Sequence, residues 1–291
     1  MTKNDSARRE GNQTKNNTNR RRSGANFRNR TNSVRSTGRL AGGKRIGATK
    51  EIYLSVVVPA YNEEKRLPQT LISIGDYLKA QRYNYEIIVV NDGSKDGTGR
   101  VVEELIGKIA NLKLIDNCQN RGKGYVARQG MLAARGKIRL FTDADNSTPI
   151  GEVEKLLPYF EQGYDVVIGS RDAKGAKLEP PQPMIRRFLG EGFGLLTNIF
   201  AGTWGIADTQ CGFKAMTARA AREILPKCEI DRFAFDPEIL AIAKMREFKI
   251  KETGILWKND PRSKVKISSM FKMFFDLLRV CANKIKGIYE K

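Results

Sequence analysis

The segment Arg139-Leu-Phe-Thr-Asp-Ala-Asp-Asn-Ser-Thr148 decides the fold. It closes a short apolar run that begins at Ile138, and two carboxylates, Asp143 and Asp145, follow that run at once. A buried parallel strand has this apolar character, and ligands of open α/β sheets bind just beyond the carboxyl ends of the strands. Mg2+ is commonly held by one or two carboxylates together with substrate phosphates. The segment therefore predicts either a metal site or ordinary turn chemistry at a strand end, and its surroundings decide between them.

Strands and helices alternate on both sides of this segment. Apolar runs predict strands at 53–59, 85–90, 112–115, 137–142 and 165–169. Apolar residues at helical spacing predict helices at 67–79, 99–109 and 120–135. Such alternation is typical of βαβ units, so we expect an α/β fold with a mostly parallel central sheet flanked by helices. The roughly 240 residues after the first fifty are enough for one domain with a full core.

Polar side chains follow the predicted strands at one edge of this sheet. Right-handed crossovers bring such loops together, so we expect a cleft that contains carboxylates, an aromatic ring and an arginine. The sequence has neither a Gly-x-Gly-x-x-Gly after the first strand nor a Walker A lysine, which excludes nucleotide binding of the Rossmann or P-loop kind. The residues expected at this edge are Tyr61, Glu63, Asp92, Asp143, Asp145, Ser170 and Arg171.

The composition limits the chemistry. The 291 residues include no histidine, so the commonest general base and metal ligand is missing. Acid–base work would fall to carboxylates or to an already ionised substrate. The four cysteines are scattered without a Cys-x-x-Cys pair, which indicates neither a zinc site nor a disulfide framework and favours a reducing compartment.

Residues 1–50 differ from the rest of the chain. They contain fourteen Lys or Arg and two Asp or Glu, so they carry +12 of the net charge of +20, and Phe27 is their only aromatic residue. A segment of this composition buries too little apolar surface to offset its ordering entropy, so we expect a disordered tail. It contains no apolar core of a secretory signal. Such a basic tail either contacts RNA or an anionic membrane surface or is solvated without a specific partner.

Several motifs resemble those of family 2 glycosyltransferases with the GT-A fold. They occupy 56–64, 91–98, 120–124, 143–145 and 169–171. Two later segments, Ala207-Asp-Thr-Gln-Cys-Gly-Phe-Lys214 and Arg232-Phe-Ala-Phe-Asp-Pro-Glu-Ile-Leu240, are similar to dolichyl-phosphate glucosyltransferases and, next, to dolichyl-phosphate mannose synthases. The similarity extends from about residue 52 to residue 280. It implies the GT-A nucleotide-diphospho-sugar transferase fold and inverting transfer of a hexose to a dolichyl or other polyprenyl phosphate, with glucose from UDP-glucose favoured.

The resemblance also implies a set of donor-site residues. Asp145 would bind Mg2+ or Mn2+, which bridges the diphosphate and neutralises the leaving group. Lys123 opens a predicted helix in a Gly-rich loop, where it either favours an anion or belongs to a simple turn. The chain departs from the family at Asn91, where members usually have Asp, and at Ser147, where mannose synthases have a metal-binding Gln. The implied nucleotide-sugar residues are Pro59, Tyr61, Glu63, Asp92, Lys123, Asp143 and Ala144.

A second set concerns the acceptor. Asp208 matches the position proposed as the catalytic base in related enzymes, but a phosphate monoester with a second pKa near 6 is already largely ionised at neutral pH. We therefore expect Asp208 to position the acceptor or tune charge, and the alternative is a helix or turn cap. The guanidinium groups of Arg171, Arg186 and Arg187 suit phosphate oxygens, although the last two could instead form a solvated basic face.

Two segments suggest contact with a membrane. The apolar stretch 188–207 is predicted to be an interfacial helix along the path of the lipid or, alternatively, a core helix, because Glu191 and five glycines argue against a membrane span. Residues 264–291 predict a Lys-rich amphipathic helix that lies in the membrane interface or packs on the sheet. The expected organisation is a basic tail at 1–50, a GT-A domain at 51–263 and this helix. The expected location is the cytoplasmic membrane face, peripherally associated.

Two other functions stay open at this point. Within the same enzyme class, the donor could be GDP-mannose. A different class is a nucleic-acid-binding protein that uses the basic tail and has a secondary or inactive core, which the sequence pI of about 9.9 favours. The tail lacks interleaved aromatics for stacking on single strands, and no recognition motif is present.

Overall fold

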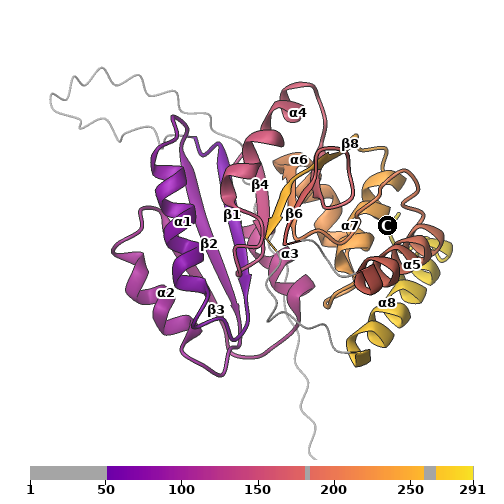
Figure 1. The fold of residues 1–291 in the computed structure, drawn as a ribbon, viewed down its shortest axis with the longest axis horizontal. Helices are drawn as coiled ribbons and strands as arrows, with labels where there is room; N and C mark the ends of the chain where they lie inside the picture. The colour runs from indigo at the N-terminus through magenta and orange to yellow at the C-terminus, as the bar shows by residue number, and fades with distance from the viewer. Residues whose placement is uncertain (1–50, 181–183, 259–266, 291) are drawn as a thin grey trace, which may run out of the picture. The chain divides into compact units, whose positions relative to one another are not determined.

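The computed structural model describes residues 51–180, 184–258 and 267–290, with only the backbone described at 184–191 and 267–270 (Figure 1). The predicted disordered tail at 1–50 lies outside the described residues, as do residues 264–266 of the predicted C-terminal segment. The predicted domain boundaries, near 50 and 263, fall in the same undescribed stretches and stay predictions.

The core is a seven-stranded sheet in the order β3-β2-β1-β4-β7-β5-β8. Every neighbouring pair is parallel except the two pairs that involve β7, which runs antiparallel to both β4 and β5. This arrangement confirms the predicted mostly parallel sheet. The strands are β1 (Leu54–Ala60), β2 (Tyr85–Asp92), β3 (Leu112–Asn117), β4 (Ile138–Thr142), β5 (Val166–Ser170), β7 (Phe213–Thr217) and β8 (Ile250–Gly254).

Helices cover both faces of this sheet because its strands are apolar on both sides. In β1, Val56 and Val58 pack with one apolar cluster, and Val57 between them packs with the other. The cluster of Val56 receives α1 (Leu67–Lys79), α2 (Thr98–Ile106), α4 (Leu157–Glu161) and the 3-10 turn η1 (Ile150–Lys155). The cluster of Val57 receives α3 (Lys123–Ala133), α6 (Ala218–Ile224), α7 (Phe235–Met245) and the 3-10 turn η2 (Leu225–Lys227).

The strand order creates a switch point beside β1. The chain moves from β1 outward to β2 and β3 and then returns to place β4 on the other side of β1. The connections that leave β1 and β4 at their carboxyl ends therefore run in opposite directions. Open α/β sheets bind ligands at such a point. The antiparallel strand β7 begins at the edge where β4 and β5 end, since Phe213 pairs with Thr142. The loop that precedes β7 consequently joins the same edge.

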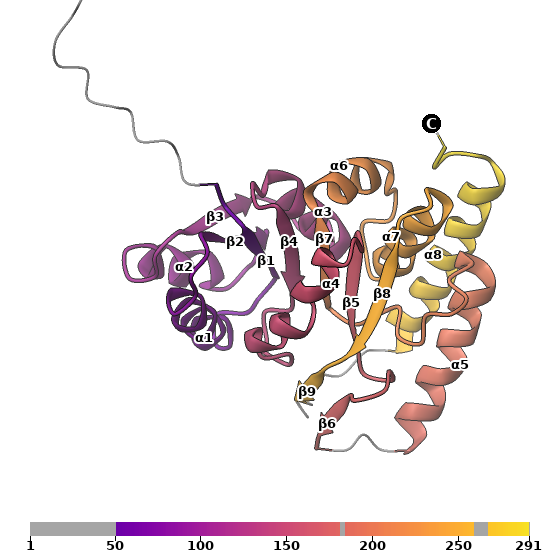
Figure 2. The same cartoon turned by 90° about the horizontal axis from the view of Figure 1, so that it is seen from above.

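Two helices pack against each other beside α7. Helices α5 (Met184–Ala201) and α8 (Ile267–Ile285) lie side by side in both views (Figures 1 and 2). The helix predicted at 188–207 thus begins earlier and ends at Ala201. The two-stranded sheet of β6 (Lys177–Glu179) and β9 (Leu256–Lys258) extends beyond β8. Among the helices that the structure describes, none has the length and apolar character needed to cross a membrane.

Candidate active site

Two loops at the carboxyl end of the sheet are bound to each other by hydrogen bonds. Asn62 after β1 has a φ of 56°, and its side chain accepts a hydrogen bond from the Lys95 backbone N–H at 2.8 Å. The Glu63 backbone N–H donates to the Thr98 hydroxyl at 2.8 Å. Tyr61 lies on this connected surface with 41% of its area exposed, so its ring is available for stacking.

Asp92 fixes a third loop at the same edge. This carboxylate is 2% exposed and accepts hydrogen bonds from the backbone N–H groups of Arg121 and Gly122 at 2.7 and 2.9 Å, and from the Asn120 side chain at 2.9 Å. Because residues 120–122 bind Asp92 in this way, α3 begins at Lys123 and not at Asn120 as predicted. The nucleotide-sugar contact expected of Asp92 stays a prediction, and the sequence did not indicate that Asp92 also fixes this loop.

The family departure at Asn91 has a local physical reason. The Asn91 side-chain amide donates to Asp116 of β3 at 2.7 Å, and its oxygen accepts from the Ser94 hydroxyl. A carboxylate at position 91 would face the Asp116 carboxylate instead of donating to it. Asparagine therefore suits this neighbour.

Asp143 lies between α3 and the loop before β7. Its carboxylate forms an ion pair with Lys123 at 2.5 Å. On the other side it contacts Gly212, where an added Cβ would lie 2.2 Å from a carboxylate oxygen of Asp143. Burial lowers the pKa of the Lys123 ammonium group, but the carboxylates of Asp143 and Asp236 outweigh this effect and raise that pKa above its ordinary value. The expected nucleotide residues Lys123 and Asp143 are therefore direct neighbours.

This contact makes Gly212 a sensitive position. We expect Gly212→Ala to push the Asp143 carboxylate away from Lys123 and to weaken nucleotide binding about tenfold, with little loss of stability because the displaced atoms end a side chain. Gly107→Ala is a matched control, since no atom lies within 4 Å of an added Cβ there. Calorimetric titration with UDP and Mn2+ measures the effect. Equal affinity of the two variants would contradict this role of Gly212.

Asp145 follows in a tight turn. One of its oxygens accepts the Ser147 backbone N–H at 3.0 Å, and the other lies 3.9 Å from the Arg66 guanidinium, which also binds Glu63. The Asp145 side chain is 16% exposed, whereas Ser147 is buried at 4%. In the described part of the chain no three His, Cys, Asp or Glu side chains converge. The donor set of Asp145 thus fits a hard cation that takes its remaining ligands from a diphosphate and water.

Asp208 and Arg171 form a two-pronged ion pair at the end of β5. The Arg171 Nε and Nη2 donate to the two oxygens of Asp208 at 2.7 and 2.8 Å, and the Arg171 backbone N–H donates at 3.0 Å. Burial disfavours the charged form of Asp208, but Arg171 holds the pKa of that carboxyl below its ordinary value. An ionised carboxylate with both oxygens engaged positions Arg171 and is a poor proton acceptor.

The amino-acid sequence also matches known families. The model of the family "Glycosyl transferase family 2" matches residues 55–225. The chain belongs to glycosyltransferase family 2. A dolichyl-phosphate beta-glucosyltransferase of Trichomonas vaginalis is 41% identical over 249 residues, which cover 81% of this chain and 75% of that protein. The proteins of the same name from Saccharomyces cerevisiae and Homo sapiens are each 36% identical, and the matches cover 83% and 81% of this chain and 78% and 77% of those proteins.

Solved structures share the fold of this glycosyltransferase. Mannosyl-3-phosphoglycerate synthase from Rubrobacter xylanophilus has a TM-score of 0.59 at 17% identity and covers 81% of this chain and 74% of its own. Glucosyl-3-phosphoglycerate synthase from Mycobacterium tuberculosis, solved with Mn2+, UDP and glucosyl-3-phosphoglycerate, has a TM-score of 0.58 at 18% identity and covers 79% and 80%. These likenesses confirm the predicted GT-A fold.

Two residues that position the Arg171–Asp208 pair of the glycosyltransferase were missed by the sequence. Glu252 of β8 accepts the backbone N–H groups of Ala207 and Asp208 at 2.9 and 2.8 Å. Trp257 of β9 lies under the Arg171 guanidinium, 5.1 Å from ring centroid to carbon. Neither belongs to a recognisable motif, and no sequence signal marks either as part of the site.

The other predicted nucleotide and acceptor residues of the glycosyltransferase lie in β1, just after β4 and in α5. Pro59 is buried in β1, and Ala144 is 6% exposed with its carbonyl accepting the Thr70 hydroxyl at 2.8 Å. Arg186 and Arg187 belong to α5, but their side chains lie outside the described ones, so their acceptor role stays a prediction.

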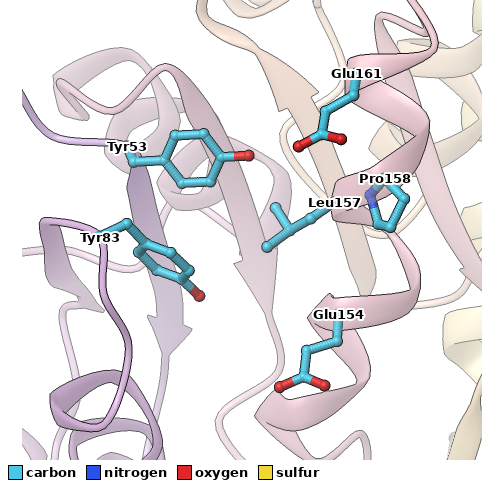
Figure 3. Close-up of a pocket in the computed structure, with 6 residues that line it drawn as sticks. All are labelled: Tyr53, Tyr83, Glu154, Leu157, Pro158 and Glu161. Atoms are coloured by element: carbon cyan, nitrogen blue, oxygen red, sulfur yellow. The ribbon is translucent and has the colours of Figure 1, made fainter.

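A separate pocket of about 410 Å3 lies near the amino ends of β1 and β2 (Figure 3). In the glycosyltransferase this is the edge opposite the loops described above, and the pocket contains none of the predicted site residues. Its lining residues are Tyr53, Tyr83, Glu154, Leu157, Pro158 and Glu161.

Proposed function

We propose that this glycosyltransferase transfers glucose from UDP-glucose to the phosphate of a dolichyl or related polyprenyl phosphate, with inversion at the anomeric carbon. The observation that carries this proposal is the 41% identity to a dolichyl-phosphate beta-glucosyltransferase over 249 residues, because a match of that extent spans most of the domain. The ion-paired clusters around Asp143 and Asp208 support it, since they meet at the carboxyl edge of the sheet. The loop 208–212 connects them.

The donor would lie against the loops after β1, β2 and β4. Tyr61 offers an exposed ring for the base, and Pro59, Glu63 and Asp92 would hold the base and ribose directly or through the backbone. Lys123 is a cation at the start of α3, where helix N–H groups also favour a diphosphate. Asp143 and Ala144 would contact the ribose side of the nucleotide.

Asp145 would hold Mg2+ or Mn2+ together with the donor diphosphate. When bound, the cation neutralises charge on the departing nucleoside diphosphate. The protein's own contribution is to keep one oxygen of Asp145 on the Ser147 N–H and the other turned to the cationic Arg66 side of the turn. Ser147 is buried, and this arrangement favours a single protein carboxylate at the metal.

Arg171 would bind the acceptor phosphate. Its guanidinium is held by Asp208 on one edge and by the Trp257 ring on one face. The phosphate monoester attacks as an already ionised nucleophile, so Asp208 has to orient Arg171 and does not have to remove a proton. Arg186 and Arg187 of α5 would add positive charge on the route of the lipid.

An exposed apolar surface on α5 and α8 would contact the membrane at its cytoplasmic face. Phe271 and Phe275 are each 65% exposed, although Leu277 and Val280 of the same helix are fully buried. The apolar stripe predicted for this helix is therefore divided between core and surface. We use the name α5–α8 surface for the exposed residues Leu195 and Ile199 of α5, Trp204 in the turn after α5, and Phe271 and Phe275 of α8.

We expect Phe271→Ser/Phe275→Ser to reduce sedimentation with phosphatidylcholine–phosphatidylserine vesicles at least about tenfold, because two phenylalanine rings no longer enter the interface. Deletion of 264–291 is a poorer test, since it also removes the buried Leu277 and Val280. Ile106→Ser/Leu132→Ser is the matched control, because both residues are exposed apolar side chains elsewhere, at 42% and 39%. Equal vesicle binding by both double variants would contradict the membrane role of the α5–α8 surface.

Calorimetric titration with UDP and with GDP, each with Mn2+, tests the donor. We expect tighter binding of UDP. A clear preference for GDP would favour the alternative of a GDP-mannose donor and leave the fold and the metal role intact. The nucleic-acid alternative rests on residues 1–50, outside the described part. RNA binding at physiological salt that survives their removal would require a new basic site in the domain.

A further inference from the structure

A fully buried ion pair lies beneath the nucleotide side of the site. The Lys214 ammonium group and the Asp236 carboxylate are 2.6 Å apart, with side-chain exposures of 0% and 5%. Lys214 comes from the antiparallel strand β7, and Asp236 from the first turn of α7. No step assigned above uses either residue. A buried pair of this kind needs a reason, because apolar residues of similar size commonly stabilise a core as well or better.

This pair is adjacent to the ion pair of Lys123 and Asp143. Lys214 donates to the carbonyl of Cys211, the residue before Gly212, which contacts Asp143. On the other side, an added Cβ at Gly124 would lie 2.6 Å from the Cβ of Phe235. The residue after Lys123 is therefore packed against the residue before Asp236.

Charges of opposite sign alternate through this cluster. Lys214 and Asp236 form one pair, Lys123 and Asp143 form the other, and the Asp236 carboxylate raises the pKa of Lys123 along with Asp143. The Lys123 ammonium is thus stabilised by two carboxylates from different elements. If Asp236 were neutral, the ammonium groups of Lys214 and Lys123 would each lose the attraction of this carboxylate.

The backbone around Asp236 also supports the start of α3. The carbonyl of Asp231 accepts the Tyr125 N–H at 3.0 Å and would lie 2.4 Å from a Cβ at Gly122. The start of this segment is held by Glu238 of α7, whose carboxylate accepts the adjacent backbone N–H groups of Glu229 and Ile230 at 2.8 and 2.9 Å. Residues 229–238 therefore form a rigid support for the loop that Asp92 binds from the other side.

We propose that Asp236 is a positioning residue that shares Lys123 with Asp143 and so keeps the Lys123 ammonium oriented toward the donor diphosphate. Lys214 neutralises Asp236 in the core and fixes its direction. The inference rests on the proposed function only in assuming that Lys123 binds the nucleotide donor. It predicts that donor affinity depends on a carboxylate that does not itself touch the donor.

The test is a double-mutant cycle read out by UDP calorimetry with Mn2+ and by urea unfolding. We expect Asp236→Asn to weaken UDP binding about tenfold and to destabilise the fold, because it leaves Lys214 without its carboxylate. In Lys214→Met/Asp236→Asn both charges are gone, so stability should recover while UDP affinity should not. If Asp236 were only the structural partner of Lys214, both would recover together, which would overturn the inference.

A second cycle identifies the residue through which Asp236 acts. In a Lys123→Met background, Asp236→Asn should cause no further loss of UDP affinity, because the group it positions is absent. Additive losses would overturn the inference. Glu229→Gln is the matched control from the same segment; it removes an exposed carboxylate 3.7 Å from Arg279 and should leave UDP affinity unchanged.

Titration of the wild-type protein and of Asp236→Asn with UDP and GDP separates failure of the proposed function from failure of this inference. Wild-type protein that binds neither UDP nor GDP would overturn the proposed function and this inference with it. If the wild-type protein and Asp236→Asn bind UDP with equal affinity, the inference alone is overturned.

Discussion

We expect Asp145→Asn to lower the rate of glucosyl transfer by about 10²–10³-fold, because an amide cannot replace the negative charge that holds the cation at the diphosphate. The expectation depends on the position of Asp145 just after β4, where its side chain is 16% exposed and lies 3.9 Å from the Arg66 guanidinium. Initial rates at saturating UDP-glucose and polyprenyl phosphate measure the effect, and EDTA should abolish the wild-type activity.

A second readout separates metal binding from catalysis. Titration of Mn2+ in the presence of UDP, followed by the electron paramagnetic resonance signal of free Mn2+, should show weaker binding by Asp145→Asn. Asp76→Asn is the matched control, since Asp76 is an exposed carboxylate on α1. Unchanged Mn2+ binding together with an unchanged rate in Asp145→Asn would remove Asp145 from the metal site.

The second large effect is expected at Asp208. Asp208→Asn should lower kcat/KM for the polyprenyl phosphate by about 10²-fold, because Arg171 loses the two-pronged carboxylate that orients it. It should also destabilise the protein. Breaking a fully buried pair costs about 3–5 kcal/mol, and the cost should be smaller here because 26% of the Arg171 side chain is exposed.

The pH dependence distinguishes positioning from base catalysis. Because the pKa of Asp208 is lowered in the folded protein, its stabilising effect is present above the ordinary carboxyl pKa and is lost as the pH falls through the folded value. The stability difference between wild type and Asp208→Asn should therefore be constant near neutrality and shrink in acid. The acid limb of kcat/KM should follow the acceptor phosphate near pH 6 in both proteins. Disappearance of that limb in Asp208→Asn would indicate that Asp208 is the base.

Local patterns were sufficient to predict the first half of the fold. The apolar spacing from Leu67 to Lys79 gave the bounds of α1 as the structure has them, and the five predicted strands match within one or two residues. Strand β7 was not predicted as part of the sheet, because Phe213-Lys-Ala-Met-Thr217 includes a lysine that is fully buried. The charge of this buried lysine is balanced by Asp236, which is distant in the sequence.

In the site, too, local features were predictable from the sequence and contacts between distant residues were not. Residues within motifs, such as Asp92, Asp143 and Asp145, lie at the predicted edge because strand ends are local features. Their partners come from tertiary contacts and escaped prediction: Arg66 near Asp145, Gly212 against Asp143 and Glu252 behind Asp208. The contacts of Gly212 and Asp208 arise because β7 inserts antiparallel between β4 and β5 and brings the loop before it to the same edge. Sequence spacing does not indicate this arrangement.

Transfer of radiolabelled glucose from UDP-glucose to dolichyl phosphate, measured in the presence of Mn2+ with extraction of the lipid product, tests the proposed reaction. We expect label in the organic phase, and we expect it to be lost with EDTA and in Asp145→Asn. Label only when GDP-mannose replaces UDP-glucose would contradict the proposed sugar donor. No lipid-linked label with either donor, from protein that is folded and bound to vesicles, would contradict the proposed acceptor.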